Sequence, residues 1–557
     1  MSGGYGAYLD IAYDGSTGRR VGLDESVPVV GSVTGAFGQS EVWSTVPPGA
    51  ASMSVDLVLN GTGAATFDDL ALSEIAPPIA SYRRDVHLSP TTIALDRISI
   101  GLGVETNPFE FSPLGALTSE RATVLTERLH VLRPAWARVF VATDWFSTPA
   151  GLDFSGPMAK ALLDDVELYR SLHARVNLVL WQASSWAPPY GGLAADLVAL
   201  LRWLEENHAT NVGLLTLANE PDLSYIPGTG SYGEGFPTPF DYEEALHAVR
   251  RALDQAGFAS IGLVGGDVAV PADGFVRAVA SALAGDLGEL SFHLYIPYPA
   301  SLCVPTLQAS EMARLGVRDR LRAVLWESNL QGGVGGNPTF SPGEVGRELL
   351  SATYPDALKL AAFYLQALAA GVGGISYWEA MDMTYPGQLT MRYGLWGSSG
   401  PPRPAYYALG LLARFLVPGS TVRAVSGGGG ALVAYEAVDL GGQRAIYMIN
   451  PWAASVMVRL DLPAGVGLSE RLLDAATVQR AEASGALRLP GQPANRSIEL
   501  PPESMGVVRL APLRSSLLHE PPEAICEVPG SARGIYHPNR SNCHDDVVAY
   551  NFLAPAR

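Results

Sequence analysis

Apolar and polar positions follow two different patterns along the chain. From about residue 88 to 398, short apolar runs of strand length alternate with longer stretches of helical period. Such alternation is typical of parallel strands joined by crossover helices. The strand candidates are Ile98–Gly103, Trp136–Val141, Val176–Leu180, Gly213–Ala218, Ile261–Val264, Leu290–Phe292, Ala323–Trp326 and Gly374–Tyr377. Eight such units in about 310 residues predict an α/β fold of the (β/α)8 barrel type.

Helical segments are predicted between most of these strands. Ser119, followed by Glu120, is typical of an N-terminal cap with an acidic first turn. One more helix, Ala405–Phe415, follows a proline-rich step after the barrel. The helices predicted between the strands are Ser119–Val131, Leu193–Asn207, Asp241–Ala256 and Tyr354–Ala370.

The barrel is flanked on both sides by period-two alternation, which is typical of sheets with one buried face. Residues 1–78 contain the runs Ala7–Tyr13, Ser52–Leu59 and Ala65–Leu72, and they predict an N-terminal β-sandwich of the jelly-roll kind. Their pattern resembles carbohydrate-binding modules found beside glycosidases. A sandwich that only braces the barrel is the alternative.

Residues 403–513 predict a second, C-terminal β-sandwich, because four further runs alternate in the same way. These runs are Ala431–Tyr435, Arg444–Ile449, Ser455–Leu460 and Gly506–Leu510. Residues 514–557 show no periodicity, so a poorly ordered extension is predicted. Two alternatives remain for it: Cys526 could pair with Cys543, or His537, Cys543, His544 and Asp545 could bind a metal, although neither set has standard ligand spacing.

Composition excludes several classes of partner. The chain has 557 residues, of which 48% are hydrophobic and 17% charged, as in large globular domains. A net charge of −18 disfavours nucleic acid and anionic membranes as partners. No apolar run reaches the length of a membrane span, and Met1–Gly6 lacks the features of a signal peptide. We expect a secreted protein whose export signal is not part of this sequence.

Two carboxylates follow strands that should lie on opposite sides of the barrel. Glu220 comes directly after Gly213–Ala218 and Asn219, on strand four, and Glu327 follows Ala323–Trp326, on strand seven. Retaining glycoside hydrolysis requires two carboxyl groups about 5–5.5 Å apart. One gives a proton to the leaving oxygen, and the other attacks the anomeric carbon. We predict Glu220 as the acid/base and Glu327 as the nucleophile.

Other polar and aromatic residues gather at the strand ends and would assist this pair. Donors such as Tyr295 and Arg138 would keep Glu327 ionised, and Asn219 is placed to hydrogen-bond a sugar 2-hydroxyl group. Trp378 could stack on a pyranose, with Trp181, Trp186 and Trp145 at neighbouring subsites, although most tryptophans are core residues. The residues predicted to bind substrate are Arg138, Trp181, Asn219, His293, Tyr295, Trp378 and Glu379.

Several motifs strengthen this interpretation. Leu217–Leu223, Ser291–Tyr295 and Leu325–Asn329 resemble the strand-four, strand-six and strand-seven motifs of a large clan of retaining (β/α)8 glycoside hydrolases. Ile375–Asp382, with Tyr393–Trp396 and Arg403–Leu409, is similar to glycoside hydrolase family 39, which also has a β-sandwich after its barrel.

The chain also departs from these families. Ala218 stands where family 39 often has Trp or Gly, and Trp181 stands where cellulase-like families have His. Residues 219–223 also resemble family 79, which includes β-glucuronidases. The resemblance implies a retaining β-glycosidase acting on a polysaccharide or its oligosaccharides, with no metal or organic cofactor. A β-glucuronidase, a transglycosylase and a non-catalytic glycan-binding protein are the alternatives.

Overall fold

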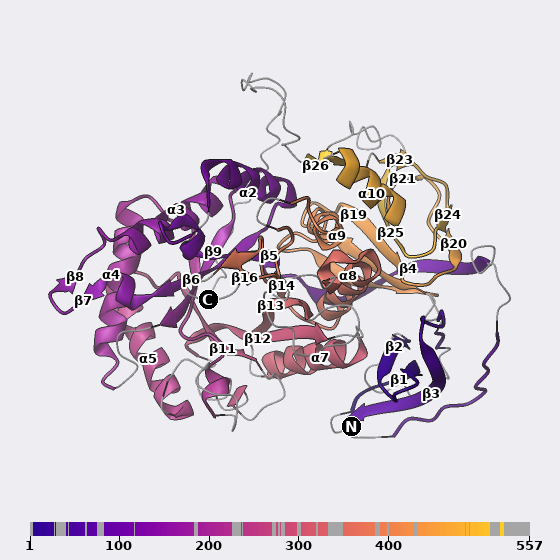
Figure 1. Cartoon of the computed structure of the whole chain (residues 1–557), viewed down its shortest axis with the longest axis horizontal. Helices are drawn as coiled ribbons and strands as arrows, with labels where there is room; N and C mark the ends of the chain where they lie inside the picture. Colours follow the sequence, from indigo (N-terminus) through magenta and orange to yellow (C-terminus); the bar gives the residue numbers. More distant parts are fainter. Residues whose placement is uncertain are drawn as a thin grey trace, which may run out of the picture.

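The computed structural model describes most of the chain (Figure 1). The described residues are 4–26, 28, 40–42, 44–61, 64–74, 83–115, 117–182, 188–225, 236, 238–269, 275–276, 279, 285–297, 302–318, 321–331, 349–384, 390–397, 400–427, 432–484, 486–489, 491–512 and 524–527. A barrel occupies one half of the view, and two groups of strands lie beside it, one formed by the N-terminal residues and one by the C-terminal residues.

The predicted barrel is confirmed: eight parallel strands close on themselves, each near a strand predicted from the sequence. Their inner layer includes the indole rings of Trp136 and Trp326, whose centroids are 6.0 Å apart. The centre of the barrel is therefore a packed core, as in other barrels of this size. In barrel order the strands are β5 (Gly101–Thr106), β6 (Trp136–Ala142), β9 (Arg175–Gln182), β10 (Val212–Thr216), β11 (Gly262–Val268), β12 (Leu287–Pro297), β13 (Arg322–Gln331) and β14 (Gly374–Tyr377).

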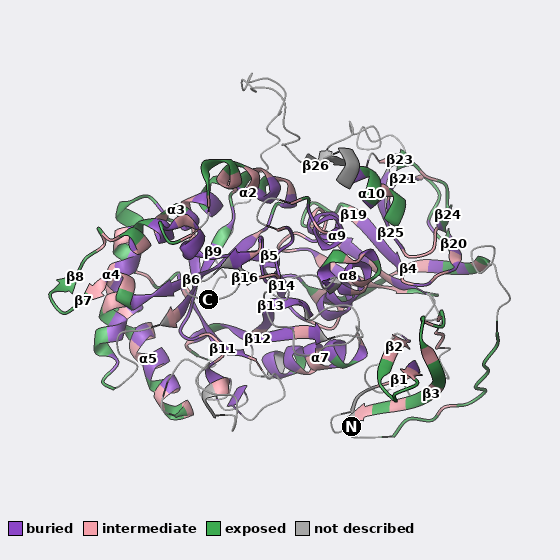
Figure 2. Ribbon diagram, viewed as in Figure 1, coloured by how far each residue is buried: buried purple, intermediate pink, exposed green. Residues whose placement is uncertain are grey.

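Most of the helices surround these strands, whereas α10 lies beside the C-terminal strands β21 (Val466–Asp474) and β22 (Ala486–Arg488). Several helix starts follow ordinary capping rules. Thr118 is the N-cap of the first long helix and accepts a hydrogen bond from the Arg121 N–H at 3.3 Å, so the prediction that Ser119 is the cap was wrong by one residue. Figure 2 shows the strands of the barrel buried and the outer sides of several helices exposed. The helices are α1 (Pro108–Phe111), α2 (Ser119–Leu132), α3 (Pro157–Ser171), α4 (Gly191–Glu206), α5 (Pro239–Ala256), α7 (Cys303–Arg318), α8 (Tyr354–Ala369), α9 (Pro404–Ala413) and α10 (Ala475–Ser484).

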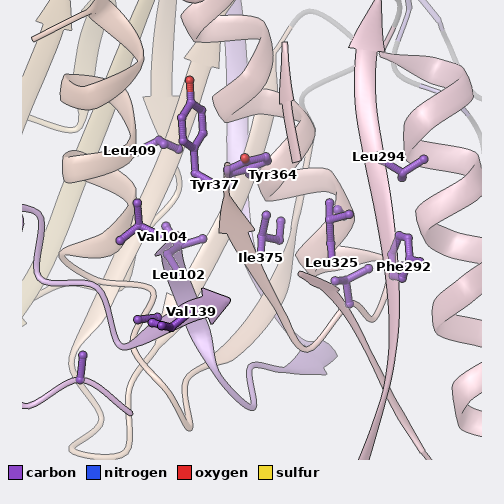
Figure 3. Close-up of a cluster of buried hydrophobic side chains, with 14 of the residues drawn as sticks. Leu102, Val104, Val139, Phe292, Leu294, Leu325, Tyr364, Ile375, Tyr377 and Leu409 are labelled. Carbon is purple, nitrogen blue, oxygen red and sulfur yellow. The ribbon is translucent and has the colours of Figure 1, made fainter. Parts of the chain in front are cut away.

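Helices α8 and α9 join the barrel to the C-terminal strands. Both helices are buried over most of their length, and both contact strands of the barrel. Helix α8 also contacts strands of the C-terminal sheet. Figure 3 shows Tyr364 from α8 and Leu409 from α9 beside side chains of the barrel strands, such as Leu102 and Ile375. Each large side chain buried here stabilises the fold by about 1.5–3 kcal/mol.

The C-terminal residues form one mixed sheet of nine strands. A two-sheet sandwich is not confirmed, because the sheet continues through β4 (Arg83–Arg97), which precedes the barrel in sequence. One end of β4 pairs in parallel with β20 and the other in antiparallel with β17, so the sheet can curl around its own apolar core. Its other strands are β17 (Thr421–Ser426), β18 (Val433–Val438), β19 (Arg444–Asn450), β20 (Ser455–Leu460), β21 (Val466–Asp474), β23 (Gln492–Pro493), β24 (Ser497–Leu500) and β25 (Ser504–Pro512).

The N-terminal residues form a three-stranded antiparallel sheet of β1 (Gly4–Gly15), β2 (Arg20–Glu25) and β3 (Ala50–Gly61). The predicted sandwich is not confirmed here either: Ala65–Leu72 forms no strand, and the described residues make a single sheet. This sheet contacts α7.

The contact with α7 is both polar and apolar. A carboxylate oxygen of Glu25 accepts hydrogen bonds from the backbone N–H groups of Leu302 and Cys303, at 2.7 and 2.9 Å. Tyr8 packs with Cys303 and Leu307. Cys303 is a buried free thiol. The N-terminal sheet therefore caps the helix that leads into the barrel strand β13.

Most of the predicted C-terminal extension lies outside the described residues, including Cys543 and the neighbouring histidines. Ala524–Glu527 is the described part, and it forms β26, which pairs with β22 (Ala486–Arg488). No helix among the described residues is both long and apolar enough to cross a membrane.

Candidate active site

Glu220 is positioned by the backbone at the end of β10. Its φ angle is 47°, in the left-handed region, where a residue other than glycine is uncommon. The Glu220 N–H donates to the backbone oxygen of Asp267 at 3.0 Å, and Asp267, at the end of the neighbouring strand β11, also has a positive φ of 51°. Two residues further along, the Ala269 N–H donates to a carboxylate oxygen of Asp222 at 3.0 Å. These hydrogen bonds hold the ends of two adjacent strands together around Glu220.

Glu327 is directed by an irregularity in β13. The register between β12 and β13 shifts after Leu325, so that Glu327 pairs with His293, and the pairing of β13 with β14 is also irregular between Leu325 and Ser328. Bulges of this kind commonly redirect a side chain beside an active site. Trp326 points into the barrel core, and Glu327 is 7% exposed.

The two carboxyl groups face each other, as the sequence predicted for strands four and seven. Carboxylate oxygens of Glu220 and Glu327 lie within 4.8 Å of each other, with a ring nitrogen of His293 in the same group. The Nδ1 atom of His293 is 3.0 Å from Glu220 Oε1 and 3.6 Å from Glu327 Oε2. Inverting enzymes need about 6.5–9.5 Å between carboxyl groups to admit a water molecule, so this spacing suits direct attack by a carboxylate.

Arg138 is the central cation of the site. It is fully buried on β6, and its guanidinium donates to four groups. One terminal nitrogen, Nη1, donates to Glu105 at 2.7 Å and to Glu327 at 3.0 Å. The other, Nη2, donates to the side-chain oxygen of Asn219 at 2.6 Å and to Asp267 at 2.9 Å. A buried cation needs such partners, and here they tie β5, β10, β11 and β13 to one point.

The protonation of Glu327 depends on a hydrogen bond from Tyr295, on burial and on the nearby positive charges. Tyr295 donates a hydrogen bond to Glu327 Oε1, and burial together with the charge of Glu327 holds the pKa of the Tyr295 phenol well above its usual range, so the phenol stays a donor. Burial also raises the pKa of Glu327, while the charges of His293 and Arg138 oppose that rise.

His293 is best described as an imidazolium. Although burial lowers its pKa, the carboxylates of Glu327 and Asp267 outweigh burial and hold the pKa well above its usual range. Its second ring nitrogen, Nε2, lies 3.1 Å from Asp267 Oδ1. The spacing of Glu220, His293 and Glu327 alone would suit a metal ion. In the structure each ring nitrogen of His293 lies within hydrogen-bond distance of a carboxylate, which is the arrangement of a group of ion pairs.

Aromatic side chains form the walls beside the carboxylates. Trp378 is buried against Tyr393 and Tyr295, with ring centroids 4.7 and 6.0 Å apart, and its peptide bond to Glu379 is cis. Its indole N–H has no hydrogen-bond partner among the described residues. Trp181 is half-buried and packs edge-on against Phe109, at 5.7 Å. Trp186 lies outside the described residues.

Glu379 belongs to a second group of acids next to Trp378. Burial, and then the charge of Glu110, raises the pKa of Glu379 well above its usual range, and burial with Asp165 does the same for Glu110. Burial raises the pKa of Asp165 to about 8. In the same group, Arg403 pairs with Asp382 at 2.6 Å. This side of the site is therefore rich in carboxyl groups.

The structure adds residues that the sequence analysis did not assign to the site. Asp267 lies three residues beyond Val264, where strand five was predicted to end, and Glu105 was missed because the first strand was placed three residues too early. Burial raises the pKa of Glu105 to about 8, although Arg138 opposes this rise. Asn329 holds the aromatic wall, because its amide donates to the backbone oxygens of Trp378 and Tyr393. Its position two residues after Glu327 was the available signal.

Comparison with known proteins gives the fold and not a family. No protein-family model matches the chain, and no curated protein matches it. Among solved structures, a family 30 endoxylanase from Clostridium papyrosolvens aligns with a TM-score of 0.54 at 15% identity, covering 76% of this chain and 99% of that chain. A glucosidase from Croceicoccus marinus aligns with a TM-score of 0.52 at 14% identity, covering 76% and 99%. An endo-β1,6-glucanase aligns with a TM-score of 0.56 at 12% identity, covering 77% and 94%.

These similarities place the chain among proteins with an α/β barrel and an associated β domain. At 12–15% identity they show the architecture alone. The similarity to family 39 suggested by the motifs is not specifically shown and stays a prediction. The assignment of roles to individual residues depends on the geometry described above.

Proposed function

We propose that the protein is a retaining glycoside hydrolase, with Glu220 as acid/base and Glu327 as nucleophile. The observation that carries this proposal is the facing pair of carboxyl groups at the barrel mouth, within 4.8 Å and bridged by His293. The structural neighbours agree with it, since their names include an endoxylanase, a glucosidase and an endo-glucanase.

The first step uses both carboxyl groups at once. Glu220, 21% exposed at its side chain, protonates the glycosidic oxygen while Glu327 attacks the anomeric carbon. The carbon–oxygen bond to the leaving group breaks and a glycosyl ester on Glu327 forms. In the second step Glu220 takes a proton from water, which attacks the same carbon and releases Glu327. Two inversions restore the original β configuration.

The neighbouring side chains would assist these two reaction steps in different ways. Arg138 and Tyr295 hold the Glu327 carboxylate in place with one hydrogen bond each. Asn219, itself fixed by Arg138, is available to a sugar hydroxyl group. Among the residues that the structure describes, the indole N–H of Trp378 and one carboxyl oxygen of Glu379 have no hydrogen-bond partner, so they would serve as a donor and an acceptor for other hydroxyl groups. The water-excluding aromatic walls strengthen each of these contacts.

The charges favour a neutral sugar over a glucuronide. Among the described residues around Trp378, Arg403 pairs with Asp382, and Arg138 is shared among acceptors that include Glu105. Glu379 and Glu110 add further carboxyl groups to the same side. A sugar carboxylate bound here would find both of these guanidinium groups already shared with carboxylates of the protein, which costs affinity.

Release of reducing sugar from glucans, xylans, mannans, galactans and glucuronides tests the proposal. We expect activity on a neutral glycan. For the matched aryl β-glycosides of a neutral hexose and of its uronic acid, we expect kcat/KM to favour the neutral sugar by at least about tenfold, or 1.36 kcal/mol. Faster cleavage of the glucuronide would instead favour the β-glucuronidase alternative. A folded protein that binds glycans without cleaving any would favour a binding protein.

A further inference from the structure

Asp267 is a heavily bonded carboxylate of the site, although the proposed reaction gives it no role as acid, base or nucleophile. It is fully buried at the end of β11. Its Oδ1 atom accepts from the Ser291 hydroxyl group and lies 3.1 Å from His293 Nε2, and its Oδ2 atom accepts from Arg138 at 2.9 Å. Its backbone oxygen accepts the N–H of Glu220 at 3.0 Å. Asp267 therefore contacts the backbone of Glu220, the proposed acid/base, and also the His293 ring, which contacts the Glu220 carboxyl group.

His293 links Asp267 to both proposed catalytic carboxyl groups. Its Nε2 faces Asp267, and its Nδ1 faces Glu220 and, at a longer distance, Glu327. Glu105 on β5 also interacts electrostatically with the ring. Arg138 on β6 and Tyr295 on the same strand as His293 bond the Glu327 carboxylate that the ring faces. Carboxylates outnumber the single guanidinium, so the surroundings favour a positive charge on the ring.

The catalytic cycle would move one negative charge between the two carboxyl groups. Before attack, Glu220 carries the proton and Glu327 the charge. In the glycosyl-enzyme, Glu327 is a neutral ester and Glu220 carries the charge. An imidazolium 3.0 Å from one and 3.6 Å from the other can stabilise both arrangements without moving.

We propose that Asp267 is a positioning residue that keeps His293 in the imidazolium form, so that His293 compensates the negative charge first on Glu327 and then on Glu220. The role of the imidazolium charge in turnover rests on the proposed function. The protonation of His293 by itself does not rest on it. The pKa of Asp267 agrees with the inference: although burial raises it, His293 and Arg138 outweigh burial and hold it below its usual range.

The test is the pH profile of Asp267→Asn, which removes the charge and keeps the shape of the side chain. In the natural protein we expect the ring to stay charged through pH 8, because the carboxylates of Glu327 and Asp267 hold the pKa of His293 well above its usual range. Without the Asp267 charge, less opposes the effect of burial, which lowers the pKa of His293. The ring should therefore lose its proton as the pH rises. We expect the ratio of kcat/KM at pH 8 to that at pH 5.5 to fall at least about tenfold relative to the natural protein, or 1.36 kcal/mol.

Ser291→Ala is the matched control, because it removes a hydrogen bond to the same Asp267 oxygen without changing any charge. Its pH profile should keep the natural shape. An equal loss of kcat/KM at every pH in Asp267→Asn would show a merely structural role and overturn the proposal.

A second measurement needs neither activity nor a stable Asp267→Asn protein. Nuclear magnetic resonance of histidine-labelled natural protein, with His293→Gln to assign the signal, reports the protonation of the ring directly. A His293 ring still protonated at pH 8 is expected, even if no glycoside is cleaved. Titration near its ordinary value of about 6.5 would contradict the inference whatever the enzyme's activity.

Discussion

Replacing Glu327 by Gln is expected to lower kcat by about 10⁴-fold or more, equivalent to roughly 5 kcal/mol of transition-state stabilisation. The amide has no negative charge and cannot form the glycosyl ester, so the double displacement loses its first step. The fold should persist, because Gln keeps the shape of the side chain and Arg138 retains Glu105, Asp267 and Asn219 as partners. The measurement is kcat on the best substrate, beside the melting temperature and circular dichroism.

The control for this variant is Glu206→Gln on the exposed end of α4, which should leave turnover unchanged. Full activity of Glu327→Gln would move the nucleophile elsewhere. Glu379 is the first alternative, since it is the next glutamate along the barrel mouth, and Glu379→Gln would then show the large loss.

Replacing Glu220 by Ala is expected to produce a loss that depends on the leaving group. For glycosides with a sugar or alkyl leaving group, which need a proton, kcat/KM should fall by about 10²–10⁴-fold. For a nitrophenyl glycoside, which leaves without protonation, the loss in the first step should be small. Added azide should restore turnover by attacking the glycosyl-enzyme without a general base, and the product should be the β-glycosyl azide.

The pattern across leaving groups distinguishes catalysis from damage to the fold. Glu220 also fixes the strand end through its N–H bond to Asp267, and an Ala substitution leaves this backbone contact in place. A uniform loss on all substrates, with no rescue by azide, would argue against an acid/base role for Glu220.

The barrel was predictable because apolar residues recur with a different spacing in its strands and in its helices. Each strand is a short apolar run. The helices α2, α4 and α5 are amphipathic stretches of the expected length, and α8 is a mostly buried stretch of helical length. The two central carboxylates were predictable for the same reason: a buried strand that ends in an acid is a local signal. Since strand order around a closed barrel follows chain order, Glu220 and Glu327 were expected on opposite sides, as the structure places them.

What escaped prediction depends on contacts between distant residues. Strand β4 pairs with β17 and β20, which lie more than three hundred residues later, and its own burial pattern is irregular around Pro90. Local periodicity cannot reveal such partners, so the curled C-terminal sheet appeared as a separate sandwich. The N-terminal runs likewise predicted more strands than the described residues form.

Within the site, electrostatic partners were harder to predict than the catalytic pair. Asp267 follows two glycines at a strand end and has an unusual backbone conformation, which no period encodes. Its importance appears only when His293, Arg138 and Glu220 are seen to meet around it. A secreted location and glycan binding by the N-terminal sheet stay predictions from the sequence.

Trapping the covalent intermediate tests the central claim most directly. The measurement is mass spectrometry of the protein after reaction with a 2-deoxy-2-fluoro glycoside of the preferred sugar carrying a dinitrophenyl leaving group. The fluorine slows the second step, so the glycosyl-enzyme should accumulate. Our account predicts one added sugar per chain, located on the peptide that contains Glu327 and absent from Glu327→Gln. A label on another residue, or no label while the parent glycoside is hydrolysed, would contradict the account.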